Sequence, residues 1–202
     1  MIIILCEGQT EERFIKEIII PAFSHLDIVP KIIMTKGGKK GGSVDYQDFL
    51  KQARNILRNT QLTLLLTIFD LAGIPSSWWK AITNHCPGHL NDKIKADIND
   101  LRFYPVWMIY EFEILAFIAP KTTGEVIGNQ YISSLEKVLK NNQHNPEAIN
   151  HDNYPSKHLE QICGKHGYQK TMDGIQIAKR LTLEQLKTTK SFTRLFDKLT
   201  EL

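Results

Sequence analysis

The sequence predicts an α/β fold in which about four mainly parallel strands are sandwiched by helices, with a helical extension at the C-terminal end. Two observations support this prediction. Over residues 1–120, apolar β-branched runs alternate with segments of helical spacing. Beyond Pro120, strand patterns disappear and helical spacing remains. We therefore expect an α/β core over residues 1–120 and a helical extension over 121–202, packed on the core as one compact unit.

Four apolar runs are the predicted strands. Met1–Cys6 is a continuous β-branched run, which is typical of a strand buried on both faces. The other predicted strands are residues 28–35, 62–69 and 103–110, the last with Pro105 near its start.

Helices are predicted between the strands and throughout the extension. The first follows Thr10, a predicted N-cap, and Pro21 is expected to kink or end it. Residues 71–90 contain two prolines and two glycines and are predicted to form a long loop. The further predicted helices are 46–58, 90–101, 111–118, 133–142, 156–163, 174–180, 183–188 and 191–199.

The composition is that of a globular chain. Its 202 residues carry a net charge of +3, too small a surplus to indicate nucleic-acid binding by itself. The three cysteines are widely spaced and form no disulfide framework, and the apolar runs are too short for a signal peptide or a membrane span. We expect a cytoplasmic protein without a membrane partner.

The most informative feature is the position of four acidic residues. Glu7 follows the first predicted strand, Asp70 follows the third, and Glu111 and Glu113 follow the fourth. In an open parallel sheet, ligands bind outside the carboxyl ends of the strands. Converging carboxylates suit Mg²⁺ or Mn²⁺, and such a site indicates phosphoryl-transfer chemistry. The alternative is that these acids cap helices and turns.

A basic, glycine-rich segment follows the second predicted strand. Lys36, Lys39 and Lys40 lie among four glycines and could bind a phosphate backbone through ammonium and backbone N–H groups. The segment is not a Walker A loop, because no Gly-Lys-Ser/Thr closes it. A solvated loop without a ligand is the alternative.

Several short motifs resemble one family. They are Glu7-Gly8-Gln9-Thr10-Glu11, Lys36-Gly37-Gly38 with Ser43-Val44, Phe69-Asp70-Leu71-x-Gly73, Tyr110-Glu111-Phe112-Glu113, Asn145-Pro146-Glu147-x-Ile149-Asn150, Pro155-Ser156-Lys157 and Tyr168-x-Lys170-x-x-Asp173-Gly174. Their order resembles the bacterial DUF4276 family, which is Toprim-like and related to the Toprim domains of OLD-type nucleases. The resemblance implies a metal-dependent nuclease, encoded beside an ATPase in mobile or defence loci.

The resemblance also implies roles for individual residues. Glu7 corresponds to the Toprim glutamate, a metal ligand or general acid/base, and Asp70 to the first aspartate of an Asp-x-Asp pair. Position 72 is Ala72, so the second aspartate is missing. Either Glu111 or Glu113 replaces it, with Glu113 favoured, or one metal binds, or catalysis is lost.

Two lysines of the C-terminal motifs complete the candidate site. Lys157 and Lys170 could neutralise charge that develops on a scissile phosphate. Ordinary surface ion pairing is the alternative.

We therefore expect a Mg²⁺-dependent or Mn²⁺-dependent nuclease that binds nucleic acid. The first alternative is a catalytically inactive interaction or regulatory subunit of an ATPase complex, which the missing second aspartate favours. The second is an enzyme that acts on nucleotides.

Overall fold

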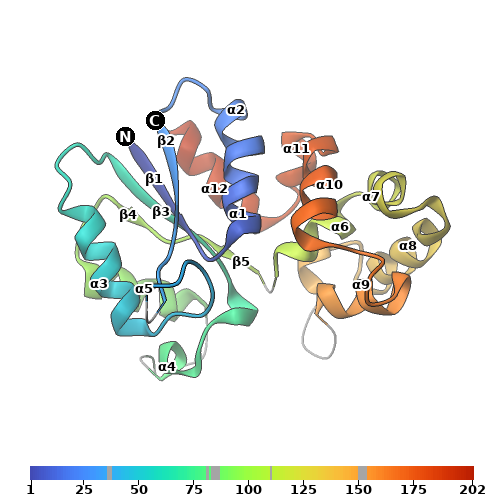
Figure 1. The fold of residues 1–202 in the computed structure, drawn as a ribbon, viewed down its shortest axis with the longest axis horizontal. Coiled ribbons are helices and arrows are strands. Elements are labelled where there is room, and N and C mark those ends of the chain that lie inside the picture. The colour runs from blue at the N-terminus through green and yellow to red at the C-terminus, as the bar shows by residue number, and fades with distance from the viewer. Residues whose placement is uncertain (36–37, 81, 83–86, 110, 150–153) are drawn as a thin grey trace. The chain divides into compact units, whose positions relative to one another are not determined.

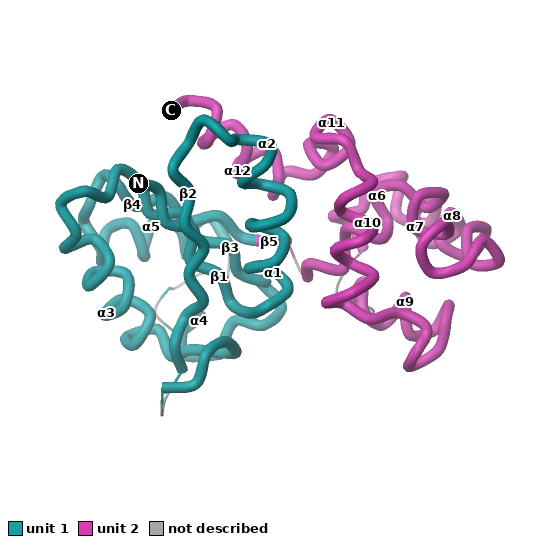
Figure 2. The backbone as a smooth tube through the Cα atoms, turned by 45° about the horizontal axis from the view of Figure 1, so that its top comes forward, with its two compact units in different colours: residues 1–107 teal, residues 108–202 magenta. Residues whose placement is uncertain are grey.

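The computed structural model describes residues 1–35, 38–80, 82, 87–109, 111–149 and 154–202. The chain divides into two compact units, residues 1–107 and 108–202 (Figure 2). This division falls before the limit expected at residue 120. We describe each unit by itself.

The first unit contains a five-stranded sheet, which confirms the predicted α/β class (Figure 1). Its strands are β1 (Ile2–Cys6), β2 (Ile28–Ile32), β3 (Leu64–Asp70), β4 (Phe103–Tyr104) and β5 (Trp107–Met108). The order is β2-β1-β3-β4, all in parallel, with β5 also paired to β3. Ile2 pairs with Ile28 on one side and Leu64 on the other, so β1 and β3 are neighbours.

The predicted fourth strand is split in two. Pro105 has no N–H group to donate, so the ladder is interrupted between β4 and β5. The side chain of Thr67 fills the gap: its hydroxyl accepts a hydrogen bond from the Val106 N–H at 3.1 Å and donates to the Val106 carbonyl at 3.2 Å. Thr67, which is fully buried, therefore links β3 to the residues between β4 and β5.

The first helix begins two residues earlier than predicted and contains a π-helical turn. It runs through α1 (Gln9–Phe14), the π-helical η1 (Ile15–Ile19) and α2 (Ile20–Ala22), with Gly8 in place of Thr10 as the N-cap. The π-helical turn ends just before the first residues of α2, which contain Pro21. Proline removes one helical hydrogen bond and its ring clashes with the preceding turn, so a widened turn is the expected response.

One face of the sheet carries a large apolar cluster. It includes residues of α3 (Tyr46–Leu57), α4 (Ser76–Trp79) and α5 (Pro87–Ile98), together with Ile3 and Leu5 of β1. Part of the predicted 71–90 loop is therefore helical, since α4 and the 3-10 turn η2 (Leu71–Gly73) lie within it. Trp78 is 1% exposed and donates its indole N–H to the Val44 carbonyl at 2.8 Å.

The second unit is helical, as predicted. Its elements are η3 (Phe112–Ile114), α6 (Leu115–Ile118), α7 (Pro120–Ile127), η4 (Asn129–Tyr131), α8 (Ile132–Asn141), η5 (Pro146–Ala148), α9 (Pro155–Cys163), η6 (Lys170–Gly174), α10 (Ile175–Arg180), α11 (Leu183–Leu186) and α12 (Lys190–Thr200). Helix α7 was not predicted. None of the helices in the described ranges is long and apolar enough to cross a bilayer.

Candidate functional site

Glu7 and Asp70 lie at the carboxyl ends of adjacent parallel strands. Cys6 of β1 pairs with Ile68 of β3, so Glu7 is level with Phe69 and Asp70 lies one residue further on. The apolar residues of both strands are buried, and the two acidic residues come where each buried run ends. Both residues therefore lie at one edge of the sheet. Asp70 is not among the residues that line the recess beside Glu7.

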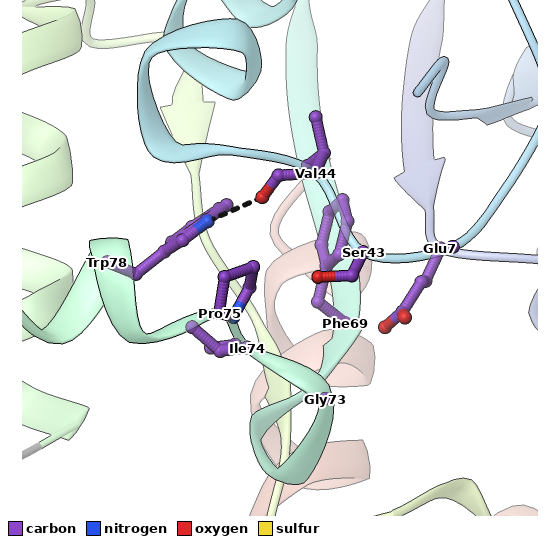
Figure 3. Close-up of a pocket in the computed structure, with 9 residues that line it drawn as sticks. Glu7, Ser43, Val44, Phe69, Gly73, Ile74, Pro75 and Trp78 are labelled. Atoms are coloured by element: carbon purple, nitrogen blue, oxygen red, sulfur yellow. Dashed lines mark hydrogen bonds between the residues drawn. The ribbon is translucent and has the colours of Figure 1, made fainter. Parts of the chain in front are cut away.

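The Glu7 carboxylate faces a recess beside this edge (Figure 3). Ser43, Phe69, Gly73, Ile74 and Trp78 are among the residues that line it. A methyl group at Gly73 would lie 3.4 Å from Oε1 and 3.5 Å from Oε2 of Glu7. The missing side chain at position 73 therefore leaves open space directly beside both carboxylate oxygens.

The predicted phosphate-binding loop is anchored to the same strand end. Gly42 donates its N–H to the Glu7 carbonyl at 3.2 Å, and Gly41 donates to the Ile33 carbonyl at 2.8 Å. Gly41 has a φ of +82°, and a side chain there would come within 3.0 Å of the Glu7 carbonyl oxygen. Glycine is therefore required for this close approach. Lys39 and Lys40 are exposed, and Lys36 lies outside the described residues.

Glu11 is a further carboxylate near this edge, and we did not single it out from the sequence. It lies in the first turn of α1, is 4% exposed, and its Oε2 would be 3.2 Å from a side-chain carbon at Gly8. Burial raises the pKa of the neighbouring Cys6 thiol, and the negative charges of Glu11 and Glu12 raise it further. Cys6 is therefore an unreactive thiol.

Glu113 and Lys170 come together in the second unit. The Lys170 Nζ lies 3.2 Å from the Glu113 Oε2, and it lies 5.9 Å from the centre of the Phe112 ring. Burial raises the pKa of Glu113, while the positive charge of Lys170 opposes that rise. Burial also raises the pKa of Tyr168, and the Glu113 charge adds to this effect. Two of the family-like motifs thus form one partly buried, polar cluster.

Glu111 has a different partner. Its Oε2 accepts a hydrogen bond from the Ser156 N–H at 2.9 Å, in the first turn of α9. A carboxylate at this position satisfies a helix-terminal N–H and interacts favourably with the helix dipole. Lys157, the next residue, forms an exposed ion pair with Glu160 at 3.2 Å. The proposed catalytic role of Lys157 and the metal-ligand roles of Glu111 and Glu113 stay predictions.

Glu147, from another of these motifs, caps helix α12. Its Oε1 accepts hydrogen bonds from the Ser191 N–H at 2.9 Å and the Ser191 hydroxyl at 2.7 Å. Its Oε2 accepts from the Lys190 N–H at 2.9 Å, and the Ser191 Oγ accepts from the Ile109 N–H at 3.1 Å. The motif around Glu147 therefore has a structural explanation.

Within the described part of the chain, no three His, Cys, Asp or Glu side chains form a cluster that could hold a metal ion. Mg²⁺ commonly uses one or two carboxylates and completes its shell with water and substrate phosphate. The carboxylates of Glu7 and Asp70 are of the type and number that such an ion takes from a protein.

A parallel sheet with acidic residues at the carboxyl ends of two strands defines an α/β protein with an acidic sheet edge. The chain belongs to the DUF4276 family, whose model, described as a domain of unknown function, matches residues 6–200. The predicted family membership is thereby confirmed. No curated protein matches the sequence.

One solved structure is similar over almost the whole chain. It is the C-terminal region of the OLD protein of Xanthomonas campestris pv. campestris, with 14% sequence identity and a TM-score of 0.48. The similarity covers 98% of this chain and 95% of that chain.

Proposed function

We propose that the chain is a metal-dependent phosphodiester hydrolase that acts on nucleic acid and uses Mg²⁺ or Mn²⁺. One observation carries this proposal: Glu7 and Asp70 occupy the carboxyl ends of adjacent parallel strands. Two carboxylates from neighbouring strands at this edge are a suitable donor set for a hard divalent cation.

The surroundings of Glu7 fit such an ion. The missing side chain at Gly73 leaves room beside both Glu7 oxygens, and carboxylate oxygen is the ligand that Mg²⁺ and Mn²⁺ prefer. In the proposed site, Glu7 and Asp70 hold the ion, and Gly73 keeps the approach to Glu7 open. When bound, the ion supplies the Lewis acidity that polarises a phosphate oxygen and offsets its negative charge.

The glycine-rich loop brings positive charge to the same region. Gly42 attaches it to the backbone of Glu7 and Gly41 attaches it to the backbone of Ile33, and Lys39 and Lys40 precede them in the chain. In the proposed reaction these lysines bind phosphates beside the scissile bond. The roles of Lys157 and Lys170 stay predictions from the sequence.

The test is cleavage by the purified full chain. Labelled DNA and RNA are incubated with Mg²⁺, with Mn²⁺ and with EDTA, using the wild type, Glu7→Gln and Asp70→Asn. We expect cleavage that needs the metal and falls about a hundredfold or more in either variant, since about 3 kcal/mol of charge stabilisation is lost. Glu136→Gln on the exposed surface of α8 is the matched control. Unchanged cleavage by both site variants would refute the assignment.

A non-catalytic subunit of an ATPase complex is the second candidate function. It is favoured by Ala72, which replaces an acidic residue expected two positions after Asp70, and by the ion pair that occupies Glu113. In this case, titration calorimetry would detect no binding of Mn²⁺, and the chain would co-purify with an ATPase.

A further inference from the structure

An open groove lies between the edge strand β2 and helix α3. Lys31, Met34 and Thr35 line its strand side. Its helix side is formed by Asp48, Lys51, Gln52, Asn55 and Ile56. These helix residues recur every three or four positions, so they share one face of α3. Two adjacent pockets share Met34, Gln52 and Asn55, which makes the groove continuous along this face.

The groove is positively charged. Lys31 and Lys51 line it, and Lys39 and Lys40 lie on the segment whose backbone pairs with Thr35 and Met34. None of these four lysines forms an ion pair with another residue in the described ranges. Asp48 is the one acidic residue among those that line the groove. The positive charge is therefore largely uncompensated, and an anionic ligand would be attracted to it.

Two of the outward-facing residues at this edge, Pro30 and Met34, cannot donate an N–H to an added peptide strand. The Ile2 N–H donates to the Asp27 carbonyl, and the Ile33 N–H donates to the Cys6 carbonyl. The backbone N–H and C=O groups of the odd-numbered residues in 27–33 therefore point toward β1. The backbone groups of the even-numbered residues point away from β1, toward the open edge of the sheet. Among these, Pro30 has no N–H group.

Met34, also outward-facing, is already paired. The side-chain amide of Gln52 accepts its N–H at 2.8 Å and donates to its carbonyl at 2.7 Å. A peptide strand added here would therefore lose the N–H donors of Pro30 and Met34, whereas a ligand recognised by charge needs no backbone partner.

The glycine-rich loop connects this groove with the candidate metal site. It leaves the groove at Thr35 and returns past Lys40, and the Gly42 N–H donates a hydrogen bond to the Glu7 carbonyl. We propose that the groove binds the phosphodiester backbone of a nucleic-acid strand and leads it along the loop to Glu7. This inference rests on the proposed function, because it assigns a substrate path to that site.

The test measures binding without catalysis. Fluorescein-labelled single-stranded DNA, single-stranded RNA and duplex DNA are titrated with the full chain in EDTA, and anisotropy is recorded over a range of salt. We expect the double variant Lys31→Gln/Lys51→Gln to bind about tenfold more weakly. The slope of log K against log salt should fall by about 1.4 on single strands, about 0.7 for each lost phosphate contact.

Two further variants sharpen the result. Lys137→Gln/Lys140→Gln removes the same charge from α8 in the second unit and should leave affinity near that of the wild type. Asp48→Asn removes the acid of the groove and should tighten binding several-fold. Equal affinities for the groove variant and the α8 control would overturn the inference. Equally effective competition by polyglutamate would also overturn it, because the groove would then favour an acidic polypeptide.

The two proposals can fail separately. If Glu7→Gln abolishes metal-dependent cleavage while the groove variant binds normally, the groove assignment is wrong and the proposed function survives. If no cleavage occurs but the groove variant loses binding, the hydrolase assignment is wrong and the assignment of the groove as a nucleic-acid site stands.

Discussion

Replacing Glu147 by alanine should destabilise the second unit without a direct effect on chemistry. Glu147 accepts three hydrogen bonds from the first residues of α12, and Ser191 is 1% exposed. Alanine removes all three acceptor contacts and leaves the N–H groups and the hydroxyl without them. The negative charge at the helix N-terminus is lost as well.

The size of the effect follows from these contacts. A hydrogen bond to a charged group contributes about 1.5–3 kcal/mol, and such contributions are not additive within one network. We expect Glu147→Ala to lower the free energy of unfolding by about 3–5 kcal/mol, which corresponds to roughly 8–15 °C in Tm. Glu147→Gln keeps an acceptor for Ser191 and loses the one for the Lys190 N–H, so we expect a loss of about 1–2 kcal/mol.

Thermal melts followed by circular dichroism give the stability, and amide hydrogen exchange shows where it is lost. Protection should fall most in α12. Glu136→Ala, on the exposed surface of α8, is the matched control and should melt like the wild type. Normal stability of Glu147→Ala together with lost cleavage would refute this reasoning, because Glu147 would then belong to the catalytic machinery.

Three other predictions concern single positions. Gly73→Ala should fold normally but bind Mn²⁺ about tenfold more weakly in calorimetry, because its methyl group would lie 3.4 Å from the Glu7 Oε1. Unchanged affinity would show that Glu7 does not bind the metal. Gly174→Ala should cost about 1–3 kcal/mol in urea unfolding, because a methyl group would lie 2.8 Å from the Tyr168 hydroxyl. Adding Tyr168→Phe should restore most of that loss. Burial raises the pKa of Asp97, but hydrogen bonds from Lys93 and Tyr46 and nearby positive charge outweigh it and hold the pKa below its usual value. Asp97→Asn should therefore melt earlier than the wild type at neutral pH, and the gap should close as the pH falls through the lowered pKa.

The order of the core elements could be predicted because each carries its own local signal. The β-branched run of β1 and the apolar stripe of α3 are visible in the sequence alone. The boundaries were less accurate where proline acts. Pro21 was expected to kink the helix, and the response is a π-helical turn, whereas Pro105 divides one expected strand into two.

The partners of the acidic residues could not be predicted. Glu111 bonds to Ser156 and Glu147 bonds to Ser191, each more than forty positions away in the sequence. No periodicity encodes such pairs, because they depend on how the helices of the second unit pack. The strand-end positions of Glu7 and Asp70 could be predicted, since the end of an apolar run fixes them.

The central claim is that Glu7 and Asp70 bind a divalent cation at the edge of the sheet. Titration calorimetry with Mn²⁺ on the wild type, Glu7→Gln, Asp70→Asn and the Glu136→Gln control tests it most directly. The account predicts binding to the wild type and the control, and loss of binding in both site variants. Equal binding by all four proteins, or no binding to the wild type with nucleic acid present, would contradict it.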